Sequence, residues 1–495
     1  MITPRAVLFA GCRPEVAAGP DGRILAVGRS ARAAAGRGAE VVRLRGEAWP
    51  GLHDAHLHLE GLAMRRLALD LTGTRSLEAA LERVRSRAEG LPEDAWIVGR
   101  GWYNDAWPVP AFPNRRQLDE AAGGRPVHLA RKDGHSVWVS SAALRAARIR
   151  RSTPDPPGGL IDRDARGSPT GILRERAVEM TRRVIPPVGE EDLDRALAAV
   201  LRSLARLGLT CVHSMDTVRG FGALQRLHAA GRLPIRVVFN LPAAALAHAE
   251  RLGLRSGWGD AWLRVWGVKA FLDGSLGSRT AEMLDGRGVA VLPQKELVEL
   301  AESCAAAELN VCLHAIGDGA VRRALDALEP LKGAWPRWRP RIEHAQCVHP
   351  SDRRRFLRAG VIASMQPIHA VSDRPLAERE WSRVGGRAYA WGALKKAGAV
   401  LAFGSDAPVE DADPLKGLDA ATGWRRRVGW HPELALDRRS ALRAYTLDAA
   451  YAAGLERELG ALSPGRYCDL TVVERSGPRP RVSATVVGGR LRHRR

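Results

Sequence analysis

The chain has 495 residues, of which 45% are hydrophobic and 26% are charged, so its composition is that of a globular protein and excludes wholesale disorder. Lysine and arginine number 76 against 55 aspartate and glutamate residues, which gives a formal net charge of +21. No stretch reaches about 18 uncharged apolar residues, so the sequence predicts no transmembrane helix.

The positive charge has two interpretations. Excess positive charge attracts phosphates and is typical of proteins that bind nucleic acid or a membrane surface. However, 69 of the basic residues are arginine, and the longest pure arginine runs are the triplets 353–355 and 425–427. No block of five or six like charges marks a binding tail, and only 5% of residues are aromatic. We therefore interpret the excess of arginine as a general bias of the composition rather than a binding surface. We expect neither nucleic acid nor a membrane as a partner.

The chain begins with a short apolar run, residues 6–11, that faintly resembles a lipoprotein signal. The run is shorter than the roughly 7–15 residues of a signal core, so we expect an opening β-strand instead. The six cysteines form no C-x-x-C pair and show no disulfide framework spacing. This pattern predicts reduced thiols and a cytoplasmic protein.

Eight short apolar runs, most of them rich in Val, Ile, Leu or Ala, recur between residues 50 and 459. They are residues 52–58, 209–213, 235–240, 265–272, 309–314, 339–344, 360–366 and 399–406. Such runs are typical of strands buried on both faces, and helix-like segments separate them. Eight strands alternating with helices predict an α/β fold, a (β/α)8 barrel.

Two further parts flank or interrupt the predicted barrel. The gap at residues 60–182 is too long for one helix and predicts an inserted subdomain. Residues 1–49 and 460–495 each carry short strands, and neither end can bury much core alone. We expect the two ends to pair as one small β-sandwich-like domain beside the barrel.

His56 and His58 are the first candidate functional residues along the chain. Their i, i+2 spacing on the first predicted strand places both imidazoles on one face. Two neutral imidazoles side by side can chelate a divalent metal. A hydrogen-bonded pair of core histidines is the alternative, because an H-x-H motif alone is common.

Four more polar residues lie at or near the C-terminal ends of other predicted strands, the face where such barrels place active sites. They are Lys269, His314, His344 and Asp406. Each alone has a structural alternative, such as a satisfied histidine or a turn cap. Together with His56 and His58, they predict a metal centre.

These motifs make the chain resemble the amidohydrolase superfamily and, within it, amidohydrolase family 3, which includes N-substituted formamide deformylases. The matching segments are Pro-Gly-Leu-His-Asp-Ala-His-Leu-His (50–58), Gly-Val-Lys-Ala-Phe-Leu-Asp-Gly-Ser-Leu-Gly-Ser-Arg-Thr-Ala (267–281), His-Ala-Ile-Gly-Asp (314–318), Arg-Ile-Glu-His-Ala-Gln (341–346), Ser-Met-Gln-Pro-Ile-His (364–369) and Gly-Ser-Asp-Ala-Pro (404–408). The insertion resembles this branch through Gly101-Trp102, Asp133-Gly134-His135 and Pro169-Thr-Gly171. The resemblance implies a metal-dependent hydrolase on a distorted (β/α)8 barrel, with the insertion covering the active site.

The resemblance also implies a role for each candidate ligand. His56 and His58 would bind the more buried metal, and His314 and His344 would bind a second metal or handle substrate and protons. Lys269 would carry a CO2-derived carbamate that bridges the metals. Asp406 would ligate a metal and act as the general base that passes a proton from the attacking water to the leaving nitrogen. One or two divalent ions are expected, with zinc as the expected metal.

Four residues are candidate substrate contacts, and for two of them, Arg279 and Trp102, structural packing is the alternative. The four are His135 and Trp102 in the insertion, Arg279 in the loop after the Lys269 strand, and His369 after the seventh strand. Glu343 and Asp54 adjoin ligands, but strand alternation is expected to point both elsewhere.

The expected function is hydrolysis of a non-peptide C–N bond (an amide, formamide or cyclic amide) in a small molecule. The same barrel and metal also suit an esterase, deaminase, decarboxylase or isomerase, because fold does not fix the reaction. A third hypothesis is a basic nucleic-acid-binding protein on a degenerate barrel. The complete set of candidate ligands argues against it, because a degenerate barrel would be expected to lose ligands. The oligomeric state stays open, and a homodimer is compatible with the sequence.

Overall fold

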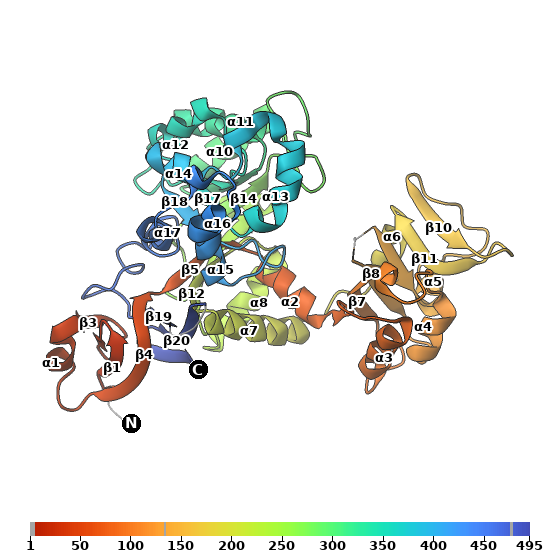
Figure 1. The fold of residues 1–495 in the computed structure, drawn as a ribbon, viewed down its shortest axis with the longest axis horizontal. Helices are drawn as coiled ribbons and strands as arrows, with labels where there is room; N and C mark the ends of the chain where they lie inside the picture. Colours follow the sequence, from red (N-terminus) through yellow and green to blue (C-terminus); the bar gives the residue numbers. More distant parts are fainter. Residues whose placement is uncertain (1–4, 133–134, 476–478) are drawn as a thin grey trace. The chain divides into compact units, whose positions relative to one another are not determined.

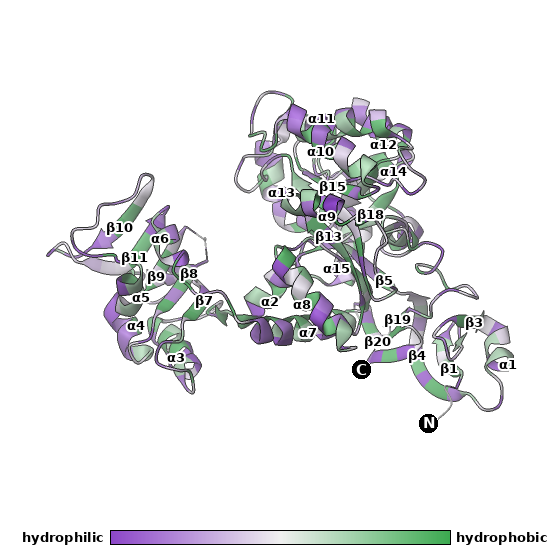
Figure 2. Ribbon diagram, turned by 180° about the vertical axis from the view of Figure 1, so that it is seen from behind, coloured by the Kyte–Doolittle hydropathy of each residue, from purple (hydrophilic) through white to green (hydrophobic). Residues whose placement is uncertain are grey.

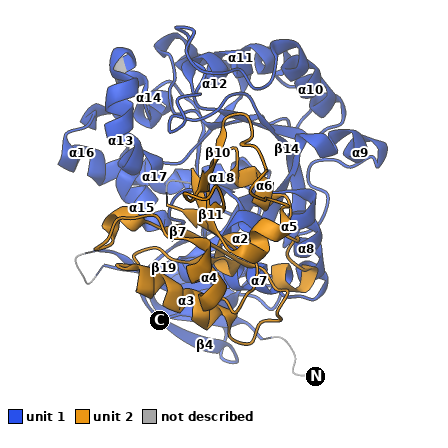
Figure 3. Ribbon diagram, turned by 90° about the vertical axis from the view of Figure 1, so that its right-hand side faces the viewer, with its two compact units in different colours: residues 1–63, 194–495 blue, residues 64–193 orange. Residues whose placement is uncertain are grey.

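The computed structural model describes residues 5–132, 135–475 and 479–495 (Figure 1). The chain forms two compact units (Figure 3). Unit 1 comprises residues 1–63 and 194–495, and unit 2 comprises residues 64–193, whereas the sequence placed the insertion at residues 60–182. The boundary falls inside helix α2 (Leu59–Leu67), which the sequence pattern did not mark.

Unit 1 is built on an eight-stranded parallel sheet in the order β18-β17-β16-β15-β14-β13-β12-β5. The strands are β5 (Leu52–Leu57), β12 (Leu209–Ser214), β13 (Arg236–Pro242), β14 (Leu263–Phe271), β15 (Asn310–Ala315), β16 (Arg341–His344), β17 (Ile362–Met365) and β18 (Leu401–Phe403). They are almost fully buried, as their continuous apolar runs predict for strands covered on both faces.

The first and last strands meet, so the sheet closes into a barrel. The Asp406 amide donates to the His56 carbonyl at 2.7 Å, and the His58 amide donates to the Ala407 carbonyl at 2.8 Å. Gly404 permits this approach, because a Cβ there would lie 2.5 Å from the His56 amide nitrogen. The predicted (β/α)8 barrel is confirmed.

From residue 190 onward the described part of the chain also forms twelve helices, several of which pack against barrel strands. The twelve are α7 (Glu190–Arg206), α8 (Val218–Ala229), α9 (Leu246–Arg251), α10 (Gln294–Ala306), α11 (Asp318–Leu328), α12 (Arg353–Ala359), α13 (His369–Glu380), α14 (Trp391–Lys396), α15 (Pro414–Asp419), α16 (Arg425–Val428), α17 (Arg438–Ala444) and α18 (Leu447–Tyr451). Those that pack against barrel strands include α8, α10, α11, α14, α17 and α18. Figure 2 shows hydrophobic and hydrophilic residues alternating along helices such as α7 and α8, as one-sided burial requires. Thr217 caps α8 by accepting hydrogen bonds from the amides of Arg219 and Gly220.

Both ends of the chain join one seven-stranded sheet, in the order β21-β20-β19-β4-β1-β2-β3. Its strands are β1 (Val7–Arg13), β2 (Val16–Ala18), β3 (Ile24–Val27), β4 (Glu40–Pro50), β19 (Leu470–Glu474), β20 (Arg481–Val487) and β21 (Arg490–Arg494). Strand β4 is the junction, because it pairs with β1 and with the C-terminal strand β19. The expected sandwich-like domain is thus one continuous sheet with a buried cluster on each face, the smaller against α1 (Ala31–Ala35).

Unit 2 has a six-stranded sheet in the order β10-β11-β9-β8-β7-β6. The strands are β6 (Leu69–Asp70), β7 (Ile97–Trp102), β8 (Val127–Arg131), β9 (Ser136–Val139), β10 (Gly159–Arg163) and β11 (Pro169–Glu175), and the helices are α3 (Leu77–Ala88), α4 (Arg115–Ala121), α5 (Ser141–Ala146) and α6 (Val178–Arg182). Three tryptophans, Trp102, Trp107 and Trp138, are buried together in its core.

All six cysteines are buried free thiols. Within the part of the chain that the structure describes, no helix combines the length and apolarity needed to cross a membrane.

Buried His128 in β8 predicts that unit 2 loses stability in acid. Burial lowers the pKa of His128 to about 4, and its Nδ1 lies 3.2 Å from the Thr181 hydroxyl. In the unfolded chain the pKa of this histidine returns to about 6.5. Between about pH 6.5 and about pH 4 the unfolded state therefore binds more protons than the folded state, and the free energy of unfolding falls as the pH drops. Between pH 7 and 5 this histidine should contribute a loss of roughly 2 kcal/mol. Urea unfolding of wild type and His128→Asn at both pH values tests this, and equal pH slopes would refute it.

Candidate metal centre

Side chains from several barrel strands converge at the C-terminal ends of the strands. The ring centroids of His56 and His344 are 4.8 Å apart, and those of His314 and His344 are 4.5 Å apart. Asp406 Oδ1 lies 3.2 Å from His58 Nε2 and 3.5 Å from His56 Nε2. Buried Lys269 interacts electrostatically with His56 and His314. The structure thus brings together all six residues that the sequence proposes as metal ligands.

Each of the four histidines has one ring nitrogen against an oxygen that only accepts hydrogen bonds. The pairs are His56 Nδ1 with Glu343 Oε2 at 2.7 Å, His58 Nδ1 with the Met215 carbonyl at 3.1 Å, His314 Nε2 with the Gly274 carbonyl at 2.9 Å, and His344 Nδ1 with Gln366 Oε1 at 2.8 Å. The engaged nitrogen therefore carries the hydrogen, and the opposite nitrogen presents a lone pair. This is how metal-binding histidines are oriented in proteins.

The free lone pairs fit a divalent ion. The ligand atoms of His56, His58 and Asp406 all lie within 4.8 Å of one another. Two nitrogens and one carboxylate oxygen make a three-residue set of the kind that catalytic zinc sites use. Among the described residues, His56 Nε2 and Lys269 Nζ are buried and have no hydrogen-bond partner. Buried polar atoms rarely stay unsatisfied, and a bound ion with a carbamate on Lys269 would satisfy both.

Burial keeps two histidines of the site neutral, whereas His58 differs. Burial would lower the pKa of His58 too, but its contact with Asp406 outweighs that effect and raises it. Burial lowers the pKa of His56 to about 4 and that of His314 to about 3, so both imidazoles are neutral. Burial alone would raise the pKa of Asp406, but its contacts with His369 and His58 outweigh that effect and hold the pKa well below the usual range. Burial also lowers the pKa of Lys269, which favours the neutral amine.

Glu343 contacts the site, so the expectation that it points elsewhere is wrong. Strand alternation would place Glu343 and His344 on opposite faces, but His344 and Ala345 have φ values of +72° and +43°. These left-handed conformations break the alternation, so both side chains face the barrel interior. Arg341 Nε lies 2.8 Å from Glu343 Oε1, and an arginine two residues before a strand-end Glu-His was the available signal. Asp54 accepts hydrogen bonds from the backbone amides of His56 and Ser405.

The Glu343 contact predicts an effect on metal binding. Burial would raise the pKa of Glu343, but Arg341 and His56 outweigh it and hold the pKa well below the usual range. The ionised carboxylate fixes His56 with its hydrogen on Nδ1 and increases the basicity of Nε2. Glu343→Gln keeps the shape but weakens the acceptor, so the dissociation constant for Zn²⁺ should rise by about 10- to 100-fold. Chelator competition on metal-stripped protein measures this, and a wild-type constant would contradict the role.

The candidate substrate residues in unit 1 have different surroundings. His369 is the first residue of α13, and its Nε2 lies 3.3 Å from Asp406 Oδ2, so it belongs to the cluster. The Arg279 side chain is 65% exposed and pairs with Glu380 at 3.2 Å, so an ion pair engages its guanidinium.

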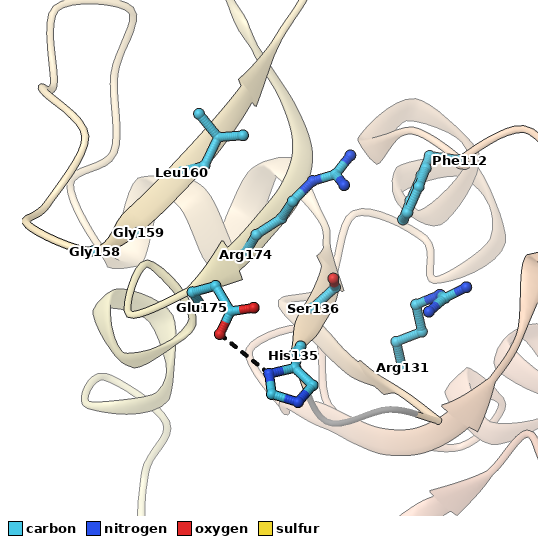
Figure 4. A pocket seen from close by; sticks show the side chains of 9 residues that line it. All are labelled: Phe112, Arg131, His135, Ser136, Gly158, Gly159, Leu160, Arg174 and Glu175. Carbon is cyan, nitrogen blue, oxygen red and sulfur yellow. Dashed lines mark hydrogen bonds and ion pairs between the residues drawn. The ribbon is translucent and has the colours of Figure 1, made fainter. Parts of the chain in front are cut away.

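The two candidates in unit 2 also differ. Trp102 is fully buried, and its indole N–H donates to the Leu129 carbonyl at 2.8 Å, so the structure gives it a packing role. Exposed His135 lies 3.1 Å from Glu175 and lines a pocket with Phe112, Arg131 and Arg174 (Figure 4). Asp133 and Gly134, part of the same motif, lie outside the described residues.

A second buried group of potential ligands consists of His53, Cys211 and His213. The Arg341 guanidinium donates to His213 Nδ1 at 2.9 Å. A guanidinium can only donate, so neutral His213 carries its hydrogen on Nε2 and has no lone pair there for a metal. This group is a packing cluster, consistent with the structural role expected for a histidine at this strand end.

Comparisons with known proteins agree with this geometry. Residues 41–493 match the model of the amidohydrolase family. The N-substituted formamide deformylase of Arthrobacter pascens is 27% identical over 499 residues, which are 92% of this chain and 89% of that protein. YtcJ of Bacillus subtilis, which is named as an amidohydrolase, is 32% identical over 458 residues, 88% of this chain and 85% of that protein. The crystal structure of an uncharacterized metal-dependent hydrolase from Pyrococcus furiosus superposes with a TM-score of 0.77 at 31% identity, covering 94% of this chain and 96% of that one. The chain belongs to the amidohydrolase family and is a metal-dependent hydrolase.

Proposed function

We propose that this chain hydrolyses a non-peptide C–N bond (an amide, formamide or cyclic amide) of a small molecule, with Asp406 as general base and acid. The observation that carries the proposal is the set of four oriented histidines around ionised Asp406. The similarity to a formamide deformylase supports this bond type. We also propose zinc as the ion and the cytoplasm as the location.

The residues suggest how one or two ions would be held. His56, His58 and Asp406 would hold the first ion, and His314 Nδ1 and His344 Nε2 would hold a second. Bound there, a divalent ion supplies Lewis acidity, which lowers the pKa of a coordinated water to about 7 and polarises the substrate carbonyl.

Lys269 would link the two positions as a carbamate. Its buried Nζ has no hydrogen-bond partner among the described residues, and burial favours the neutral amine. The amine lone pair attacks the carbon of CO2, an N–C bond forms, and one proton leaves the nitrogen. The product is a carbamate, whose single negative charge is shared by two oxygens that would serve as metal ligands.

Asp406 would move the proton between water and leaving group. The carboxylate is ionised at neutral pH and can accept the proton of the attacking water. An amine leaves poorly as an anion, so the protonated carboxyl then donates to the leaving nitrogen.

Phe271 supports a substrate with an apolar substituent. It ends β14 with 49% of its surface exposed, and its ring centroid lies 5.2 Å from that of His314. An exposed aromatic ring beside metal ligands offers apolar area that a substrate can cover.

A substrate panel on the zinc-loaded protein tests the proposed bond type. The panel holds N-aryl and N-alkyl formamides, cyclic amides, carboxylic esters and amino-substituted heterocycles. We expect turnover of a formamide or amide in preference to the ester and amine classes. Turnover confined to esters, or release of ammonia from the heterocycles alone, would refute C–N amide hydrolysis.

A further inference from the structure

A histidine outside the family-implied ligand set lies against Asp406. His369 comes from helix α13 rather than from a strand end, and only 9% of its side chain is exposed. Its Nε2 lies 3.3 Å from Asp406 Oδ2, and no hydrogen bond among the described residues satisfies this nitrogen. The imidazole is therefore a buried polar group that faces into the ligand cluster.

The two oxygens of Asp406 face different neighbours. Oδ1 faces the Nε2 atoms of His56 and His58, at 3.5 and 3.2 Å, whereas Oδ2 faces His369. Asp406 also has a φ of +61°, a left-handed conformation that costs a non-glycine residue about 1 kcal/mol or more and persists only when its surroundings hold it. A contact that holds Oδ2 therefore also determines where Oδ1 points.

An acidic side chain lies behind His369. The Nδ1 of His369 lies 3.8 Å from Asp373, one turn later in α13, and the Tyr389 hydroxyl donates to Asp373 Oδ2 at 2.5 Å. Tyr389 is buried against Trp381, Trp391 and Trp430. The chain Asp406–His369–Asp373–Tyr389 thus runs from the ligand cluster into the aromatic core of unit 1.

We propose that His369, backed by Asp373 and Tyr389, is a positioning residue that sets the orientation of the Asp406 carboxylate, so that Oδ1 faces the metal-binding histidines and Oδ2 is available for the proton that is transferred. This proposal rests on the metal centre and on the Asp406 role under the proposed function. It separates the ligand oxygen from the proton-accepting oxygen of one carboxylate.

The test measures Zn²⁺ binding to metal-stripped protein by chelator competition, so no substrate is needed. His369→Leu should raise the dissociation constant by about 10- to 100-fold, as loss of a partner behind a ligand does. His369→Gln should stay near wild type, because its amide N–H can take the place of Nε2–H. His349→Leu is the matched control, because His349 is half-buried and caps a short turn by accepting a hydrogen bond from the Ser351 amide. It should bind Zn²⁺ like wild type.

The visible spectrum of the Co²⁺-loaded protein gives a second readout, because it reports the coordination of the ion. We expect a changed spectrum in His369→Leu and a wild-type spectrum in His369→Gln. If His369→Leu does not fold, Asp373→Asn carries the test, and its dissociation constant should also rise. Wild-type Zn²⁺ binding and an unchanged Co²⁺ spectrum in His369→Leu, with an altered KM alone, would overturn the proposal and make His369 a substrate contact. Failure of the proposed function looks different, because wild type would then bind Zn²⁺ but hydrolyse no amide.

Discussion

Asp406→Asn is expected to lower kcat for amide hydrolysis by about 10³-fold or more. The asparagine amide cannot accept a proton from water, and general acid–base catalysis alone contributes about 10²- to 10⁴-fold. The variant also replaces a charged ligand oxygen with a neutral one within reach of His56 and His58. Steady-state kinetics on the preferred substrate measure the effect, together with the metal content of the same sample.

The control for this variant is Asp419→Asn, which changes an exposed aspartate that pairs with Arg427. It should keep wild-type turnover and metal content. If Asp406→Asn turns over substrate at the wild-type rate with normal metal content, the carboxylate has no part in proton transfer.

Lys269→Ala is expected to abolish binding of one metal ion and to reduce turnover by about 100-fold or more, since a bound metal supplies several kcal/mol of stabilisation to developing charge. The alanine leaves space where the buried amine and its carbamate would lie. A short carboxylic acid or bicarbonate can enter that space and supply the missing oxygens. We therefore expect partial recovery of metal content and turnover with added acetate, propionate or bicarbonate.

Lys269→Arg separates a bridging carbamate from a simple cation. An arginine keeps the positive charge but cannot react with CO2, because its guanidinium stays protonated. A fully active Lys269→Arg variant with normal metal content would contradict the carbamate.

The sequence predicted the barrel and the residues that meet at the C-terminal ends of its strands, and both predictions rest on the geometry of parallel strands. Parallel strands present their C-terminal ends at one face, so a polar residue that ends a buried apolar run marks that face. His56, His314 and His344 follow this rule directly. Asp406 lies three residues beyond β18, and the rule held because the loop folds back onto β5.

The sequence did not predict that Glu343 contacts the metal centre, because that contact depends on local backbone geometry. Glu343 was assigned away from the site because alternation assumes extended backbone, and the left-handed φ of His344 could not be read from the pattern. For Trp102 the sequence left open a substrate contact or packing in the insertion, and its complete burial in unit 2 favours packing. The excess arginine also has structural uses, as in the buried ion pair of Arg236 with Asp469 at 2.8 Å.

Titration of the metal-stripped protein with Zn²⁺, followed by hydrolysis of the preferred formamide or amide, tests the central claim most directly. We predict no turnover without metal, and an increase that saturates at one or two equivalents of Zn²⁺. Turnover by the stripped protein at the rate of the loaded one would contradict a metal-dependent reaction at this centre.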